Sequence, residues 1–370
     1  MKMNVVNEFI ALASINSLSR QEGPVADYLI GKLRGLGYDF EVDGSAVRTG
    51  SDTGNILVRV AGNRPGPTVL LCAHMDTVGP TDGMVPVVRD GVVYSNGETV
   101  LGADDKAGVA ILLAVLADLR GGGLPHPDLE VLFTVQEEVG LSGAEALDAK
   151  LKAAFGYVLD GDGPVGWIIN QAPSKVDLDL VITGKAAHAG VCPEAGVNAI
   201  VVAAKAIARL RTGRIDRQTT SNVGLISGGR IRNIVADRAE VNLEVRSTDQ
   251  AKLEAEVQAV LKAFEEEAAS AGAQLSVRKE FPFVTFTIAE THPVVANAFR
   301  AARALGIEPR LQTTGGGMDA NIFNLQGLPC IGLGIGIEEA HSPKEHIAAA
   351  QLEAGVRFIE ALLKEAAAMA

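Results

Sequence analysis

Histidines and carboxylates stand at the ends of strand-like apolar runs in this chain, far apart in sequence but alike in position. Two imidazoles and several carboxylates form the ligand set that borderline divalent metal ions such as zinc prefer. In chain order the candidates are His74, Asp76, Asp104, Glu137, Glu138, Asp160 and His341. The pattern predicts a centre for two metal ions, of the kind that activates water for hydrolysis.

The pair His74 and Asp76 places two polar side chains on one side of an extended segment, because strand side chains repeat every two residues. An imidazole in this arrangement can bind a metal through one ring nitrogen while the carboxylate accepts a hydrogen bond from the other. The alternative is a His-x-Asp at the surface end of a strand, without a ligand.

Two acidic pairs and one single aspartate have more than one reading. Asp104 opens a helix-like stretch, where it could cap the helix or bridge two cations, and Asp105 is then the cap or an orienting neighbour. Glu137 and Glu138 end an apolar strand, where they repel each other unless cations compensate them. In a metal centre one would bind metal and the other would take a proton from water. Asp160 is a ligand or a turn residue.

Three further segments carry groups that could bind a substrate. His188 could reach an oxyanion, or it could be an ordinary loop histidine. The glycine-rich turn at 315–321 could hold an anion or a peptide backbone, or be a close-packed turn. A segment with two arginines could bind a carboxylate. The candidates from the turn and from this segment are Gly316, Asp319, Asn321, Arg230, Arg232 and Asn233.

Apolar strands alternate with helices in the first part of the chain. We expect strands at 55–60, 68–73, 129–135 and 157–160, and helices at 5–13, from a capping box at 19–22 to about 35–37, at 104–119 and at 142–153. This order predicts an α/β fold, with a mostly parallel central sheet flanked by helices. Ligands of such sheets bind at the carboxyl ends of the strands, where most of the candidate residues fall.

The pattern changes in the middle of the chain. Alternating apolar and polar residues at 176–182 indicate a strand with one solvent-exposed face. The β-α-β-β-α-β order that follows describes a ferredoxin-like α+β domain. The α/β pattern then returns, with a strand at 330–333 and a final helix. We therefore predict a catalytic domain of residues 1–175 and 292–370, interrupted by an inserted domain of residues 176–291.

Composition argues against several classes of protein. The 370 residues are 47% hydrophobic, and 33 basic against 45 acidic residues give a net charge of −12, which disfavours binding to nucleic acid or anionic membranes. Three scattered cysteines form neither a disulfide framework nor a CxxC zinc site. No apolar run approaches the ~20 residues of a membrane span, and no signal-peptide core is seen. We expect a soluble cytoplasmic protein.

Taken together, the motifs resemble those of the M20 family of dinuclear metallopeptidases, and most of all its peptidase T (tripeptidase) branch. The matching stretches follow the family's order and are residues 73–78, 102–108, 137–140, 159–161, 187–190, 315–321 and 341–343. The resemblance implies metal-dependent hydrolysis of short peptides with release of the N-terminal residue. It also implies a zinc-peptidase-like catalytic domain and an inserted lid domain, through which the chain could form a homodimer.

The resemblance further implies two divalent metal ions per chain, which would be zinc or else manganese or cobalt. It also implies which residues would hold them. His74 and Asp160 would hold one ion, and Glu138 and His341 would hold the other. Asp104 would bridge the two, and the peptide bond that follows it would be cis.

Catalytic roles implied by the resemblance fall to three residues. Asp76 would orient the first histidine ligand, Glu137 would act as general base and then as proton donor, and His188 would stabilise the oxyanion from the lid. Two departures from the family's pattern bear on the substrate. Met318 stands where relatives often carry Ser or Thr, and no proline follows Asn233 as it does in the family's Asn-x-x-Pro-Asp stretch.

Other functions stay open. An N-acyl-amino-acid deacylase or a carboxypeptidase of the same family would anchor the substrate by its other end, and a panel of N-blocked and free peptides would separate them from an aminopeptidase. A non-catalytic metal-binding or peptide-binding protein would be expected to lack Glu137 or one of the ligands. An NAD-type protein would need a GxGxxG fingerprint, which the glycine runs do not match.

Overall fold

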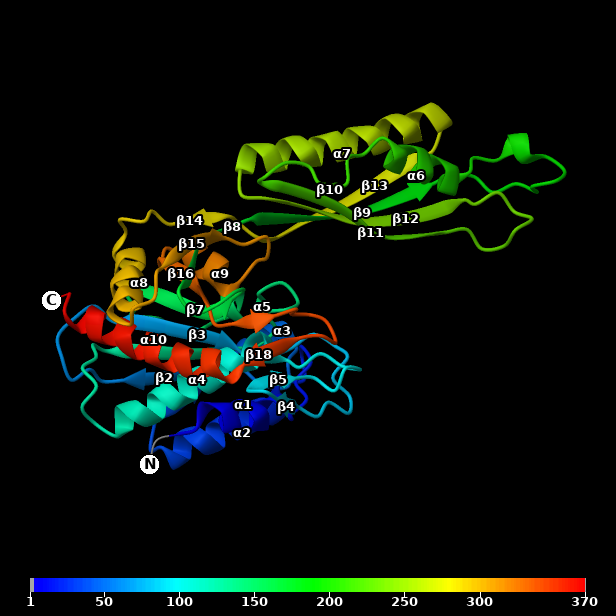
Figure 1. Ribbon diagram of the computed structural model, residues 1–370. Helices are drawn as coiled ribbons and strands as arrows, with labels where there is room; N and C mark the ends of the chain where they lie inside the picture. Colours follow the sequence, from blue (N-terminus) through cyan, green and yellow to red (C-terminus); the bar gives the residue numbers. More distant parts are fainter. Residues whose placement is uncertain (1–2, 370) are drawn as a thin grey trace. The chain divides into compact units, whose positions relative to one another are not determined.

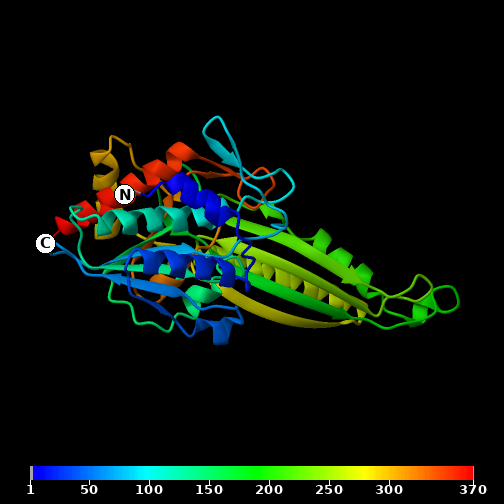
Figure 2. The same cartoon turned by 90° about the horizontal axis from the view of Figure 1, so that it is seen from below.

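The computed structural model describes residues 3–369, so positions 1, 2 and 370 of the predicted catalytic domain lie outside it. Figures 1 and 2 show the chain from two sides. It divides into two compact units, one of Met1–Ala172 with Thr287–Ala370 and one of Pro173–Phe286. Within residues 3–369 we find no helix whose length and hydropathy would suit a bilayer-spanning segment.

A nine-stranded sheet forms the centre of the first unit. In spatial order its strands are β1 (Phe40–Val42), β2 (Ile56–Val60), β6 (Leu129–Thr134), β3 (Val69–His74), β7 (Phe155–Gly161), β16 (Cys330–Gly334), β8 (Trp167–Ala172) and β14 (Phe286–Thr287), with β15 (Arg310–Thr313) beside β8. Strands β6, β3, β7 and β16 pair in parallel, whereas β1, β2 and β8 pair antiparallel with their inner neighbours. The predicted α/β fold with a mostly parallel central sheet is confirmed.

Helices cover both faces of this sheet (Figure 1). All of β3 is buried: Val69 and Leu71 join the large core, while Leu70 and Cys72 point to the opposite face, because successive strand residues alternate. The large core contains α1 (Val5–Ala13), α2 (Gly23–Gly35), α4 (Ala103–Arg120), α8 (Pro293–Ala304) and α10 (Ala349–Ala367). The shorter helices are α3 (Ser45–Thr49), α5 (Ser142–Glu145) and α9 (Asp319–Leu325), of which α9 contacts β7 and β16.

A second, four-stranded antiparallel sheet frames the segment that carries His341. Its strands, in spatial order, are β17 (Ile337–Glu338), β18 (His346–Ala348), β5 (Val92–Tyr94) and β4 (Val87–Arg89). The sequence does not reveal this sheet, because strands of two or three residues are too short to show an alternating pattern. The pairing of β17 with β18, and of β18 with β5, ties both ends of the His341 loop.

The helix predicted at 142–153 is much shorter than expected. It ends at Glu145. Farther along, the backbone N–H groups of Lys152 and Ala153 both donate to the side chain of Glu130, at 2.7 and 2.9 Å, instead of to helical carbonyls.

The capping box predicted at 19–22 is also wrong. Helix α2 begins at Gly23 and has no side-chain cap. The hydroxyl of Ser19 donates instead to Asp76 Oδ2, at 2.7 Å. A side chain that resembled a helix cap in the sequence thus belongs to the candidate site.

The second unit is an antiparallel sheet with two helices. Its strands, in spatial order, are β10 (Gly213–Arg214), β11 (Thr219–Gly228), β12 (Arg238–Ser247), β9 (Ser174–Thr183) and β13 (Gln274–Phe283), and its helices are η1 (Pro193–Ala195), α6 (Ala199–Ala208) and α7 (Gln250–Ala271). Alternate residues of β9, such as Leu178 and Leu180, pack with α6 and α7 in a separate core. Apart from the added β10, this is the β-α-β-β-α-β order that the sequence pattern indicated.

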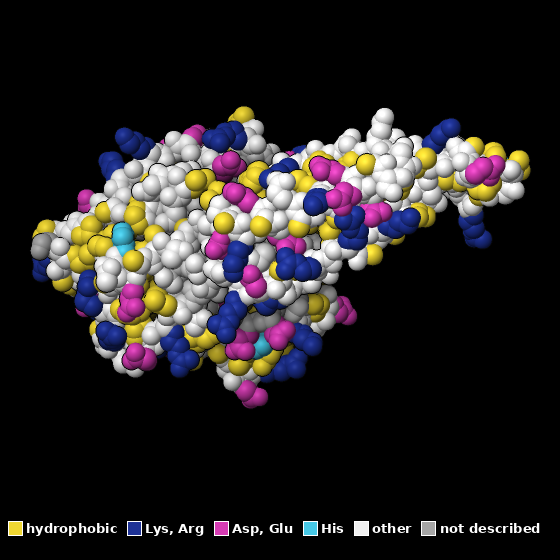
Figure 3. Space-filling view, turned by 90° about the horizontal axis from the view of Figure 1, so that it is seen from above, with side chains coloured by type: hydrophobic (Ala, Val, Ile, Leu, Met, Phe, Trp, Pro, Cys, Tyr) yellow, Lys and Arg dark blue, Asp and Glu magenta, His cyan; other side chains and the backbone are white. Residues whose placement is uncertain are grey.

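Acidic and basic side chains are mixed on the surface. Figure 3 shows Lys and Arg interspersed with Asp and Glu over the visible face. The acidic residues, which outnumber the basic residues by 45 to 33 in the chain, therefore do not form one contiguous patch on that face.

Candidate metal centre

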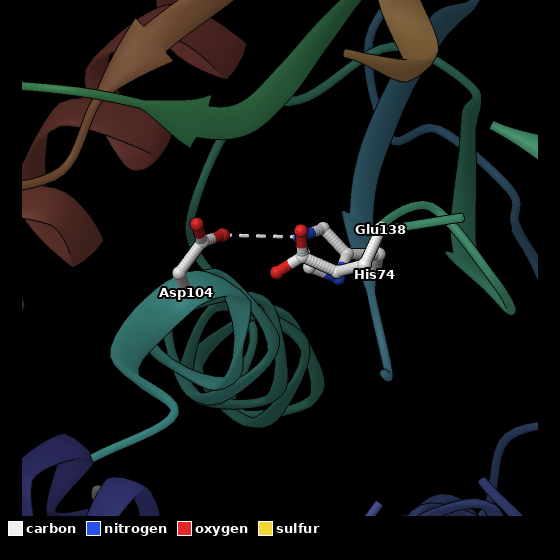
Figure 4. A group of neighbouring side chains, drawn as sticks. All are labelled: His74, Asp104 and Glu138. Atoms are coloured by element: carbon white, nitrogen blue, oxygen red, sulfur yellow. Dashed lines mark hydrogen bonds and ion pairs between the residues drawn. The ribbon is translucent and has the colours of Figure 1, made fainter. Parts of the chain in front are cut away.

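His74 is the last residue of β3, and the backbone orients its buried ring. Nδ1 lies 2.9 Å from the carbonyl oxygen of Asp76. An Nδ1–H group that donates to this oxygen leaves the lone pair of Nε2 free for a metal ion. Nε2 faces Asp104, whose Oδ1 lies 3.1 Å away (Figure 4).

Asp104 lies between the two imidazoles. Its Oδ1 is 3.1 Å from Nε2 of His74, and its Oδ2 is 3.1 Å from Nε2 of His341. Its backbone angles (φ −81°, ψ 104°) are extended, but both of its oxygens face the imidazoles, and the hydrogen bond from the N–H of Gly108 in α4 goes to Asp105 instead. The peptide bond to Asp105 is cis, as the resemblance implied. A carboxylate with one oxygen toward each imidazole suits a bridge between two cations.

Glu138 and Asp160 lie beside this pair of contacts. Nε2 of His341 is 3.1 Å from Glu138 Oε1, and Nε2 of His74 is 4.0 Å from Asp160 Oδ1. Two sets of side chains each offer ligand atoms that all lie within 4.8 Å of one another. One set is His74, Asp104 and Glu138 (Figure 4), and the other is His74, Glu137 and Asp160. Five residues predicted as ligands thus converge at the carboxyl edge of the central sheet.

The chemistry of these side chains fits divalent cations. Glu138 Oε1 is buried and lacks a hydrogen bond of good geometry, although His341 Nε2 is near. Burial, and repulsion from Asp104 and Glu137, raises the pKa of Asp160 well above its usual value. Burial also raises the pKa of Glu137. Cations among these oxygens would offset both the lost hydration and the mutual repulsion.

Asp105 acts both as a helix cap and as an orienting neighbour, the two roles that the sequence left open. It is fully buried. Its Oδ2 accepts a hydrogen bond from the backbone N–H of His74 at 3.1 Å, and its Oδ1 accepts one from the N–H of Gly108 at 3.0 Å. The same carboxylate therefore binds an N–H group of α4 and orients the end of β3.

The turn that carries Glu137 and Glu138 is held by side chains from other segments. Four successive backbone N–H groups donate to buried oxygens: Val135 to Asn55 Oδ1 (3.0 Å), Gln136 to Glu22 Oε1 (3.1 Å), Glu137 to Asp76 Oδ1 (3.0 Å) and Glu138 to Asp76 Oδ2 (3.2 Å). The Asp76 carboxylate is 3.4 Å from Nδ1 of His74, farther than the Asp76 carbonyl. The Asp76 carboxylate is therefore closer to the N–H groups of the turn than to the ring of His74. The roles of Glu22 and Asn55 were not predicted from the sequence.

A pocket of about 520 Å³ opens onto the converging side chains and includes Asp104, Glu138 and Asp160. Gly316, a predicted substrate contact, lines it together with Thr314, Gly315, Gly317 and Met318. Two further carboxylates at its surface belong to Asp162 and Glu339. The pocket therefore carries more negative charge than the ligand candidates alone would give it.

Asp319 and Asn321, two other predicted substrate contacts, are not among the residues that line this pocket. Both are buried at the start of α9. Asp319 Oδ2 accepts a hydrogen bond from the hydroxyl of Thr134 at 2.6 Å, and Asn321 Oδ1 accepts one from the N–H of Met318 at 3.1 Å. Internal hydrogen bonds hold both side chains beneath the glycine-rich turn.

The remaining predicted residues belong to the second unit, where they meet. His188 is exposed, and its loop pairs with the segment before β12: the N–H of Ala189 donates to the carbonyl of Asn233 at 3.0 Å. Arg230 is exposed and forms an ion pair with Asp237 at 2.6 Å, and Arg232 is also exposed. Two segments that sequence analysis singled out separately thus form one exposed region of this unit.

The fold and the convergent ligands define a class of metal-dependent peptidase, and comparison with known proteins agrees. The chain belongs to peptidase family M20/M25/M40, whose model matches residues 70–365. It is 40% identical over 364 residues to the uncharacterized protein YqjE of Bacillus subtilis, with 98% of each chain covered.

Two solved structures are similar over nearly the whole chain. Aminopeptidase PepT from Bacillus cereus has 39% identity and a TM-score of 0.90, with 99% of both chains covered. A tripeptidase from Staphylococcus aureus has 35% identity and a TM-score of 0.94, with 100% of this chain and 99% of that chain covered. The resemblance to the M20 family and its peptidase T branch is thereby confirmed.

Proposed function

We propose that this protein is a metal-dependent aminopeptidase that releases the N-terminal residue of tripeptides. The observation that carries the proposal is the placement of Asp104, whose two oxygens each lie 3.1 Å from a different imidazole, beside Glu137. The similarity to an aminopeptidase and a tripeptidase over nearly the full chain supports the same activity.

His74 and Asp160 would hold one divalent ion, Glu138 and His341 the other, and Asp104 both. Zinc is our first choice and manganese or cobalt the alternatives, since imidazole and carboxylate ligands suit all three. Bound at this position, the ions would polarise the scissile carbonyl and lower the pKa of a water molecule toward ~7.

Glu137 acts in this proposal as the proton carrier. Its carboxylate takes the proton of the attacking water and passes it to the leaving amine. The hydrogen bond from its own N–H to Asp76, at 3.0 Å, fixes the turn and keeps the carboxylate among the ligands. Asp76 thus serves both Glu137 and the ring of His74.

The second unit would act as a lid that brings His188 to the oxyanion of the substrate. Exposure of His188 supports this role, because an exposed imidazole can meet a ligand. Arg230, Arg232 and Asn233 lie beside its loop and would bind the carboxylate at the far end of the peptide, so that the lid selects short substrates. Gly316 would contact the substrate backbone.

The acidic surplus of the pocket favours an aminopeptidase over a deacylase. Once two divalent ions compensate the ligand carboxylates, Asp162 and Glu339 still add negative charge at the pocket surface. This charge attracts a free amino terminus and gives no advantage to an N-acylated one.

We also propose that the second unit mediates a homodimer. Its strand β11 pairs with β10 only at Thr220 and Ser221, and beyond them it exposes Leu225 and Ile226 at the sheet edge. A second copy could pair with such an edge.

We further propose that the protein acts in the cytoplasm. Its three free thiols are consistent with this reducing compartment.

The test is hydrolysis of a free tripeptide, its N-acetylated form and the matching dipeptide by metal-stripped protein, before and after zinc, manganese or cobalt is added. Cleavage of the free tripeptide alone, restored by metal, is the expected result. Cleavage of the acetylated compound would point to a deacylase or carboxypeptidase instead. No cleavage by protein that binds two ions would leave the substrate assignment wrong.

A further inference from the structure

One buried carboxylate outside the ligand set holds the segment that presents Asp104. Glu345 is 1% exposed. Its Oε2 accepts hydrogen bonds from the N–H groups of Leu101 and Gly102, at 2.7 and 2.8 Å, and its Oε1 accepts one from the N–H of Asp104 itself, at 3.0 Å. Three backbone donors on one carboxylate leave this loop little freedom.

For the N–H of Asp104, this contact does the work of a helix cap from a distant part of the chain. The first N–H groups of a helix lack partners inside it, and a negative charge near them is favoured. Gly102, which precedes α4, has no side chain to supply that partner. Glu345 supplies it across 241 residues of sequence.

Glu345 also belongs to the segment that carries His341. Its own N–H donates to the carbonyl of Ser342 at 3.0 Å, and the hydroxyl of Ser95 donates to the carbonyl of Pro343 at 2.7 Å. The next residue begins β18. Glu345 therefore joins the two chain segments whose side chains meet where Asp104 Oδ2 lies 3.1 Å from Nε2 of His341.

We infer that Glu345 is a positioning residue of the metal centre, which sets the spacing between Asp104 and His341 and thereby the affinity for the metal ions. The inference rests on the metal-binding part of the proposed function and not on its peptide substrate. A carboxylate suits the task because both of its oxygens accept. An amide in its place has one oxygen and one NH₂ group, so an N–H of the loop faces another donor.

Glu345→Gln is the direct test, and Glu130→Gln is its matched control. Glu130 is 2% exposed and also accepts from two backbone N–H groups, at 2.7 and 2.9 Å, with Arg59 as its third partner. It lies near the start of β6, away from the carboxyl edge where the ligands converge. Glu345→Asp keeps the charge and serves if the glutamine variant does not fold.

The measurements are the melting temperature of metal-free protein, calorimetric titration with Zn²⁺, the visible spectrum with Co²⁺, and kcat and KM. Both glutamine variants are expected to melt at lower temperature than the unsubstituted protein. Only Glu345→Gln should lose Zn²⁺ affinity, by about 10- to 100-fold, the usual effect of removing a residue that orients metal ligands. Its Co²⁺ spectrum should change, kcat should fall with little change in KM, and excess metal should restore part of the activity.

Unchanged Zn²⁺ affinity in the Glu345 variants would overturn the inference, and so would an equal loss in Glu130→Gln, since the effect would then be one of general stability. Glu345→Asp should show a smaller loss of affinity than Glu345→Gln. Because metal binding is measured without peptide, failure of the tripeptidase assay would count against the proposed substrate and leave this result intact.

Discussion

Asp76 Oδ1 lies 3.0 Å from the backbone nitrogen of Glu137, so a side chain at the end of one parallel strand holds the turn that follows its neighbour. Asp76→Asn replaces one accepting oxygen of this contact with an NH₂ group. We expect kcat/KM to fall about 10- to 100-fold while both metal ions stay bound. Steady-state kinetics with metal analysis checks this, with the exposed Asp128→Asn as control. Full activity in Asp76→Asn would show that the hydrogen bond has no catalytic consequence.

Glu137→Gln tests the proton carrier. The amide cannot accept a proton, yet it occupies nearly the same volume, so the centre should still bind two ions. General acid–base catalysis contributes about 10²–10⁴-fold, and kcat should fall by that factor. Glu339→Gln, which changes another carboxyl group of the same pocket, should keep kcat and raise only KM, because its charge attracts the amino terminus but carries no proton in the reaction. Turnover that persists in Glu137→Gln would require a different base.

His188→Ala tests the oxyanion contact proposed for the second unit. Loss of one oxyanion donor costs about 10²–10³-fold in kcat. Because His188 is exposed, the melting temperature and the metal content should not change. Lys185→Ala, in the same connection between β9 and α6, is the comparison. Equal kinetics for the two variants would remove His188 from the mechanism.

Chelation should inactivate the protein and also destabilise it. Without cations the buried carboxylates repel one another, and a ligand present at 100 times its Kd adds about 3 kcal/mol to the free energy of unfolding. Calorimetry of stripped and metal-loaded protein measures the difference, and added metal should reverse both effects. Stripped protein that keeps its activity would contradict a metal-dependent reaction.

Asp319, a buried carboxyl group outside the proposed ligand set, gives a pH dependence of stability. Burial raises the pKa of Asp319 from 3.8 to about 6. Because the folded state holds this proton more tightly than the unfolded state, its contribution is complete below pH 3.8 and is lost as pH rises through about 6. The loss is about 3 kcal/mol, at about 1.4 kcal/mol per pKa unit.

The side chain of Asn cannot titrate. The free energies of unfolding of metal-free Asp319→Asn and of the metal-free parent protein should therefore diverge as the pH changes. Relative to the parent, the variant should gain about 3 kcal/mol between about pH 4 and about pH 7, measured by urea unfolding. Asp27→Asn, on the exposed face of α2, should run parallel to the parent. A pH-independent difference between Asp319→Asn and the parent would mean that Asp319 is ionised throughout.

The ligand positions could be predicted from sequence because the strands before them are buried on both faces. A strand such as β3 reads as an unbroken apolar run, and a polar residue at its end stands out. His74, Glu138 and Asp160 all follow such runs. Knowing that the carboxyl ends of parallel strands meet at one edge was then enough to group them.

The residues that hold the site could not be predicted in this way. Glu22, Asn55 and Glu345 accept hydrogen bonds from backbone N–H groups between 80 and 244 residues away, and no local pattern marks such pairs. The burial of Asp319 was not apparent from the sequence for the opposite reason. The glycines before it suggested an open ligand-binding turn, whereas the residue packs beneath it.

The small sheet formed by β17, β18, β5 and β4 has a consequence for synthesis of the chain. The second imidazole, His341, and the nearby Glu345 follow all the other candidate ligands in the chain and are therefore synthesised after them. Until β18 pairs with β5, the earlier ligands lack the segment that completes the centre. A peptidase built this way acquires its activity only after the segment with His341 has been made and has joined the small sheet, so the unfinished chain before that point cannot cut itself.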